Sequence, residues 1–238
     1  MTQLIMIPGV LCDERLFAAQ ITALGDVADI VVADITRQSS IPAMADAVLA
    51  DAPERFCLAG FSLGSQVALQ IMETAPERVE RLALLSATHG GLLPTSAAAF
   101  QKALEPIEHG GFEAYLESLF PVYFTERDAQ KPELKRIFMD MAHNVGQEAG
   151  LRQMRALLEL REPFANLDRI RCQTVVIGGA EDHRTTFEAH EMLAREIPGA
   201  KLVKIAGSAH FTTLEQPEAV SAALRNWLTK TRDLSAMA

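Results

Sequence analysis

The feature that most limits the fold of this chain is a series of short apolar runs without alternating polar residues. Strands buried on both faces have this pattern, because helices cover both sides of a parallel sheet. Between most of the runs lie segments with helical spacing, such as residues 187–197 and 217–228. The runs span residues 4–7, 30–33, 56–59, 82–85, 174–177 and 202–205.

Strands that alternate with helices predict right-handed crossovers and an α/β fold. We therefore expect a doubly wound, mostly parallel sheet of about six strands. Residues 91–162 interrupt the alternation, because no strand-like run occurs there. This stretch contains four segments with helical spacing, at 96–104, 112–119, 133–141 and 148–160. We expect 91–162 to form a helical cap inserted into a core made of residues 1–90 and 163–238.

Composition narrows the possible partners. The net charge of −9 repels phosphate backbones and anionic lipids, so we expect neither nucleic acid nor a membrane as partner. No segment approaches the ~18 apolar residues of a membrane span, and the first residues do not resemble a secretory signal. These observations predict a cytoplasmic protein.

Cysteine and histidine spacing gives no sign of a metal centre. Three cysteines stand far apart and without a C-x-x-C pair, which argues against a disulfide framework or a zinc ribbon. Four histidines lack the spacing of zinc ligands, namely His109, His143, His183 and His190. We expect no metal and no organic cofactor.

The sequence Gly60-Phe61-Ser62-Leu63-Gly64 follows an apolar run and precedes a helical pattern. A G-x-S-x-G motif in this position is typical of a nucleophile elbow, in which the serine hydroxyl is exposed on a tight strand-to-helix turn. Ser62 is therefore the candidate nucleophile. The backbone N–H of Leu63, at the start of the helix, is a candidate oxyanion donor.

A serine nucleophile requires a base and an acid that orients the base. His210 follows the last apolar run, at the sheet edge where ligands gather in open α/β sheets. Glu181 and Asp182 both follow the fifth run at the same edge, and the residues alone leave both open as the acid. The turn after the first run offers the second oxyanion donor, the N–H of Val10. His89, at the end of the fourth run, and Phe211 are candidates for lining the substrate pocket.

Four segments together resemble the α/β-hydrolase superfamily, among its short esterase-like members, over residues 4–228. They are Ile7–Leu11, Gly60–Gly64, Gly178–Asp182 and His210–Glu218, the last of which is similar to the family's G-H-x-x-x-x-E-x-P-E segment. The resemblance implies a serine hydrolase with the order Ser62, Asp182, His210, and so favours Asp182 over Glu181.

The expected function is hydrolysis of a small to medium carboxylic ester through an acyl-enzyme on Ser62. The cap would supply an apolar pocket for an apolar, ester-like substrate. The same triad could instead serve C–C bond hydrolysis, lactone hydrolysis, acyl transfer or a lyase reaction, because one fold hosts many chemistries. An alternative of another class is a non-catalytic protein that binds a small ligand.

Overall fold

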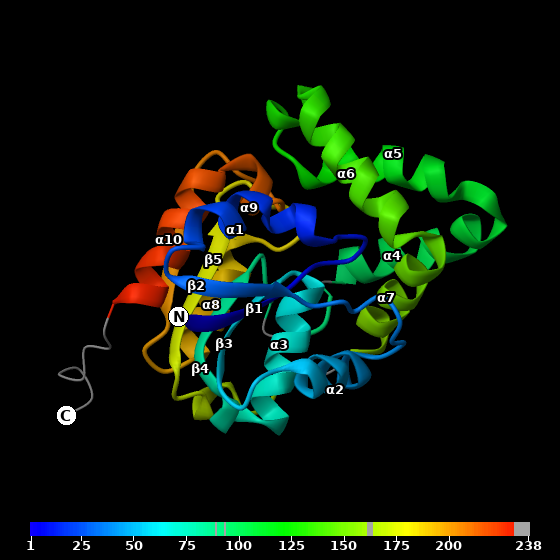
Figure 1. Ribbon diagram of the computed structural model, residues 1–238. Coiled ribbons are helices and arrows are strands. Elements are labelled where there is room, and N and C mark those ends of the chain that lie inside the picture. Colours follow the sequence, from blue (N-terminus) through cyan, green and yellow to red (C-terminus); the bar gives the residue numbers. More distant parts are fainter. Residues whose placement is uncertain (89, 93, 161–163, 231–238) are drawn as a thin grey trace.

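All strands of the described chain lie parallel in one sheet, in the order β2-β1-β3-β4-β5-β6. The computed structural model describes residues 1–88, 90–92, 94–160 and 164–230 (Figure 1). Each strand overlaps one of the predicted apolar runs, which confirms the α/β fold class. The strands are β1 (Thr2–Ile7), β2 (Ala28–Val32), β3 (Phe56–Phe61), β4 (Val79–Leu85), β5 (Gln173–Gly179) and β6 (Lys201–Ile205).

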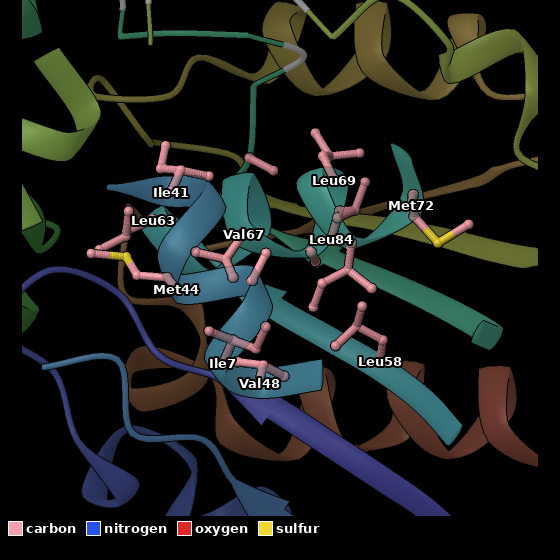
Figure 2. Close-up of a cluster of buried hydrophobic side chains, with 14 of the residues drawn as sticks. Ile7, Ile41, Met44, Val48, Leu58, Leu63, Val67, Leu69, Met72 and Leu84 are labelled. Carbon is pink, nitrogen blue, oxygen red and sulfur yellow. The ribbon is translucent and has the colours of Figure 1, made fainter. Parts of the chain in front are cut away.

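Successive strand residues point to opposite faces of the sheet, so the apolar strands present buried side chains on both faces, and helices cover both. Ile5 and Ile7 of β1 belong to one buried cluster, and Leu4 and Met6 belong to the other. Figure 2 shows the first cluster, where the side chains of Val67 and its neighbours meet the strands. This face is covered by α2 (Ile41–Asp51), α3 (Leu63–Thr74) and α8 (Phe187–Glu196). The other face is covered by α1 (Ala18–Leu24) and α10 (Pro217–Thr229).

The interruption between β4 and β5 is helical, as predicted. Its helices are α4 (Pro94–Pro106), α5 (Phe112–Tyr123), α6 (Pro132–Val145) and α7 (Gln147–Glu159). They gather on one side of the molecule, beside one end of the sheet (Figure 1). Their division from the core as a separate cap remains a prediction.

Two contacts join these helices to the loops that follow β1 and β6. The backbone N–H of Leu11 donates to Oε1 of Gln153 in α7 at 2.9 Å. The N–H of His210 donates to the carbonyl oxygen of Tyr123, the last residue of α5, at 3.1 Å. The helical segment therefore touches the edge of the sheet where the sequence predicts the site.

Within the described ranges, no helix combines the length and apolar character that a membrane crossing requires. The same part of the chain contains no group of three or more His, Cys, Asp or Glu side chains arranged to hold a metal ion.

Candidate active site

Ser62 occupies the sharp turn between β3 and α3. Its backbone φ of +53° lies in the left-handed region, which residues other than glycine rarely adopt. Two hydrogen bonds hold the turn: Ser62 N–H donates to the carbonyl oxygen of Leu85 at 2.9 Å, and Ser65 Oγ donates to that of Gly60 at 2.7 Å. The surrounding structure thus stabilises a strained residue, as is common at functional sites.

The two glycines of the motif are required by close backbone approach. A Cβ atom at Gly64 would lie 2.1 Å from the carbonyl oxygen of Ile7, at the end of β1. A Cβ atom at Gly60 would lie 2.3 Å from the carbonyl oxygen of Gly64 itself. Any larger residue would therefore push α3 away from the sheet and displace the hydroxyl of Ser62.

The structure brings the three predicted site residues together in one hydrogen-bonded chain. Oγ of Ser62 lies 3.1 Å from Nε2 of His210, and Nδ1 of His210 lies 2.8 Å from Oδ2 of Asp182. A carboxylate only accepts hydrogen bonds, so Nδ1 carries the proton that it donates to Asp182. Nε2 is then free to accept the hydroxyl proton of Ser62.

Asp182 is the acid in contact with the imidazole, while the side chain of Glu181 is exposed. Oδ1 of Asp182 accepts the backbone N–H groups of Arg184 and Thr185 at 2.8 and 2.9 Å. Burial by itself raises the pKa of Asp182, but His210 and these two N–H groups outweigh that effect and hold the pKa below its usual value. The carboxylate therefore stays ionised beside His210 at neutral pH.

Glu215 anchors the loop that carries His210. This residue lies in the short helix α9 (Thr212–Glu215) and is almost fully buried. Its carboxylate accepts the N–H groups of Ala209 and Thr125, each at 2.8 Å, and the hydroxyl of Ser208 at 3.2 Å. Burial raises the pKa of Glu215, and these donors oppose that rise. Glu215 thereby joins the His210 loop to the segment after α5.

His190, in α8, supports the opposite side of the site. Its Nε2 accepts the N–H of Ala87 at 3.1 Å, and its Nδ1 donates to the carbonyl oxygen of Thr186 at 3.0 Å. Burial lowers the pKa of His190, so the ring stays neutral in this tautomer. His190 therefore positions the backbone after β4.

The two predicted oxyanion donors lie next to the nucleophile. Leu63 is the first residue of α3, and Val10 lines the same pocket as Ser62. In the described part of the chain, no acceptor takes the N–H of either residue. Leu11, which follows Val10, has a φ of +58°, and Gln153 accepts its N–H. A helix of the 91–162 segment therefore fixes the turn that carries Val10.

A pocket opens above Ser62 and His210. Its empty space, including the mouth, is about 430 Å³. The predicted residue Phe211 lines it, whereas His89 lies outside the described residues. Cys12 also lines the pocket, but burial raises the pKa of this thiol so far that it stays protonated and does not compete as a nucleophile.

Sequence reasoning missed several pocket residues. Phe100 of α4, Tyr123 of α5 and Leu157 of α7 line the pocket from the 91–162 segment, and Arg184 lines it from the loop after β5. The ring of Tyr123 stacks on the imidazole of His210, with 5.0 Å between ring centroids. No motif marks these residues, because each comes from a separate element.

Residues 15–223 match the model of the alpha/beta hydrolase family. The match covers most of the chain, which therefore belongs to this family, and hydrolase activity is the function that its relatives support.

Two curated relatives and one solved structure illustrate the similarity. A Klebsiella pneumoniae protein with the provisional name carbamate hydrolase RutD is 26% identical over 178 residues, which are 73% of this chain and 66% of that protein. The (E)-2-((N-methylformamido)methylene)succinate hydrolase of Acinetobacter baylyi is 25% identical over 175 residues, which are 73% of this chain and 65% of that protein. A thermophilic esterase from Thermogutta terrifontis, determined with malate bound, superposes with a TM-score of 0.84 at 22% identity, over 96% of this chain and 89% of that one. The last similarity shows the fold alone.

Proposed function

We propose that this protein hydrolyses carboxylic esters through an acyl-enzyme formed on Ser62. The observation that carries the proposal is the continuous hydrogen-bonded chain from Oγ of Ser62 through His210 to Asp182, opening onto a pocket. Hydrolase names among the relatives agree with hydrolysis in general. The choice of a carboxylic ester rests on the activated serine, because acyl transfer is the reaction that such a group performs best.

The proposed reaction has two halves. Ser62 attacks the ester carbonyl carbon while His210 takes the hydroxyl proton at Nε2, and His210 then gives this proton to the departing alcohol. In the second half a water molecule attacks the acyl-enzyme, again with His210 as base, and releases the acid and Ser62. Asp182 stabilises the imidazolium in both halves, because its carboxylate is ionised and bonded to Nδ1.

Two backbone groups are suited to stabilise the oxyanion. The N–H of Leu63 starts α3, so the positive end of the helix dipole adds to its effect. The N–H of Val10 stands in the turn held by Gln153. Removing one such donor typically costs ~10² to 10³ in rate. In this proposal the 91–162 segment acts as a cap that limits access of bulk water to the site.

The test compares Ser62→Ala with Ser118→Ala, a change at an exposed serine in α5. For a short-chain ester, Ser62→Ala should lower kcat by about 10⁶-fold, because no other group can form the acyl-enzyme. The control should match the wild type. A fluorophosphonate should also label the wild type once, at Ser62, as shown by peptide mass spectrometry.

Substantial ester turnover by Ser62→Ala would contradict this mechanism. A wild-type protein that binds small esters, leaves them uncleaved and takes up no phosphonate would instead be the non-catalytic ligand-binding protein.

A further inference from the structure

We propose that Arg184 binds a carboxylate of the substrate, so that the preferred ester carries a negative charge a few bonds from its scissile carbonyl. The inference rests on the proposed ester hydrolysis and extends it to a class of substrate. It also departs from the apolar substrate expected from the sequence.

The backbone of Arg184 is tied to the acid of the site. Its N–H donates to Oδ1 of Asp182 at 2.8 Å. Its side chain lines the same pocket as Ser62 and His210, so a molecule bound against the serine hydroxyl also meets the guanidinium. The loop that orients the imidazole thus also presents a positive charge to the substrate.

Aromatic rings from the 91–162 segment hold the guanidinium in the pocket. Its central carbon lies 5.7 Å from the ring centroid of Phe100 and 5.3 Å from that of Tyr123. Ring faces attract a cation without neutralising it. The side chain of Arg184 also hydrogen-bonds with that of Tyr123. A guanidinium has five N–H donors, so it can still bind a planar carboxylate through two parallel hydrogen bonds.

Within the described residues, no carboxylate pairs with Arg184. Both oxygens of Asp182 already have partners, Oδ2 with His210 and Oδ1 with backbone N–H groups. Other arginines of the chain do form ion pairs, among them Arg127 with Asp128 and Arg225 with Asp26. A half-buried cation without a counterion carries a desolvation cost, which an incoming carboxylate would offset.

The size of the pocket limits the length of the substrate between its carboxylate and its scissile carbonyl. The enclosed cavity at this site is only about 40 Å³, well below the roughly 300 to 1,000 Å³ of ordinary ligand pockets. The carboxylate and the scissile carbonyl must share this space, so the spacer between them is short. Half-esters of small dicarboxylic acids fit these requirements.

The kinetic test compares esters of the same shape and different charge. Monomethyl succinate carries the carboxylate, and methyl succinamate replaces it by a neutral amide; acetoxyacetate and acetoxyacetamide place the same change on the alcohol side. For at least one of these two pairs, the wild type should show a higher kcat/KM for the charged ester than for its neutral counterpart. In Arg184→Met that preference should fall by about 10- to 100-fold, the usual effect of losing a charged hydrogen bond. Arg184→Lys should recover part of it.

Arg195→Met is the matched control, because Arg195 is exposed in α8 and pairs only loosely with Glu191, at 3.7 Å. It should keep the wild-type preference. If wild type and Arg184→Met show the same charged-to-neutral ratio for both pairs, the inference is wrong while the proposed ester hydrolysis stands.

A binding measurement separates the inference from turnover. Calorimetry should show monomethyl succinate binding to Ser62→Ala about 10- to 100-fold more tightly than to the Ser62→Ala, Arg184→Met double variant. Equal affinities would overturn the role of Arg184. If neither ester is cleaved by the wild type but this difference in binding is present, the proposed hydrolysis fails and the carboxylate site remains.

Discussion

At the residue scale, the site depends on backbone positions where a side chain has no room. In Gly64→Ala the new Cβ would lie 2.1 Å from the carbonyl oxygen of Ile7, so β1 and α3 must separate. We expect the free energy of unfolding to fall by about 1–3 kcal/mol, the usual cost of overpacking. We also expect kcat for ester hydrolysis to fall, because Ser62 and Leu63 move with the helix. Urea unfolding and ester kinetics check the two effects.

Gly25→Ala provides the comparison for this change. Gly25 ends α1 with a φ of −63°, which any residue adopts, and a Cβ there would lie 3.3 Å from its nearest neighbour. The free energy of unfolding of Gly25→Ala should stay within about 1 kcal/mol of that of the wild type. If Gly64→Ala were as stable and active as Gly25→Ala, the close approach of the two backbones would not constrain the elbow.

The sequence could predict Ser62 and His210 because each follows a recognisable strand and stands in a motif. The acid was harder to predict, since Glu181 and Asp182 are adjacent and only the family resemblance favoured one of them. Arg184 could not be predicted at all. A charged residue in a polar loop is ordinarily solvated, and its contact with Phe100 and Tyr123 arises only when distant helices fold over the sheet edge.

At the element scale, α7 controls the turn that carries Val10. Gln153 is fully buried, and its Oε1 accepts the N–H of Leu11. Gln153→Met keeps the approximate volume and removes the acceptor, which leaves a buried N–H unpaired. We expect kcat to fall by about 10-fold, with a smaller change in KM. This fall is smaller than the ~10² to 10³ of losing an oxyanion donor outright, because the N–H of Val10 is displaced and not removed. Steady-state kinetics on a neutral short-chain ester measure both constants.

Gln101→Met, at an exposed position of α4, is the matched control and should retain the wild-type kcat. Equal values of kcat for Gln153→Met and the wild type would mean that the turn holds its geometry without α7.

The strands could be predicted because burial on both faces leaves a continuous apolar signal, although their ends differ by a few residues. Helix α1 could not be predicted. It spans only Ala18–Leu24, and one of its core-facing residues is Gln20, which is fully buried and donates to the carbonyl oxygen of Thr213 at 3.3 Å. A polar residue on the buried face of so short a helix hides the amphipathic pattern.

At the scale of the whole molecule, the helical segment and the sheet share their hydrophobic clusters. One cluster joins Ile7 of β1 to Met154 of α7, and the other joins Met6 of β1 to Phe138 of α6. The contact between His210 and Tyr123 adds a polar link. The boundary predicted near residues 91 and 162 therefore separates two parts of the chain whose buried side chains pack together.

The shared clusters predict that the core and the 91–162 segment unfold in one transition, because unfolding either part would expose buried side chains of the other. Trp227, the chain's single tryptophan, lies in α10 and donates to the carbonyl oxygen of Gln173, so its fluorescence reports on the core. Far-UV circular dichroism reports on all helices, including α4 to α7. In urea, the two signals should change with the same midpoint. A loss of ellipticity at lower urea than the Trp227 change would show instead that the 91–162 segment unfolds independently, as a separately stable cap.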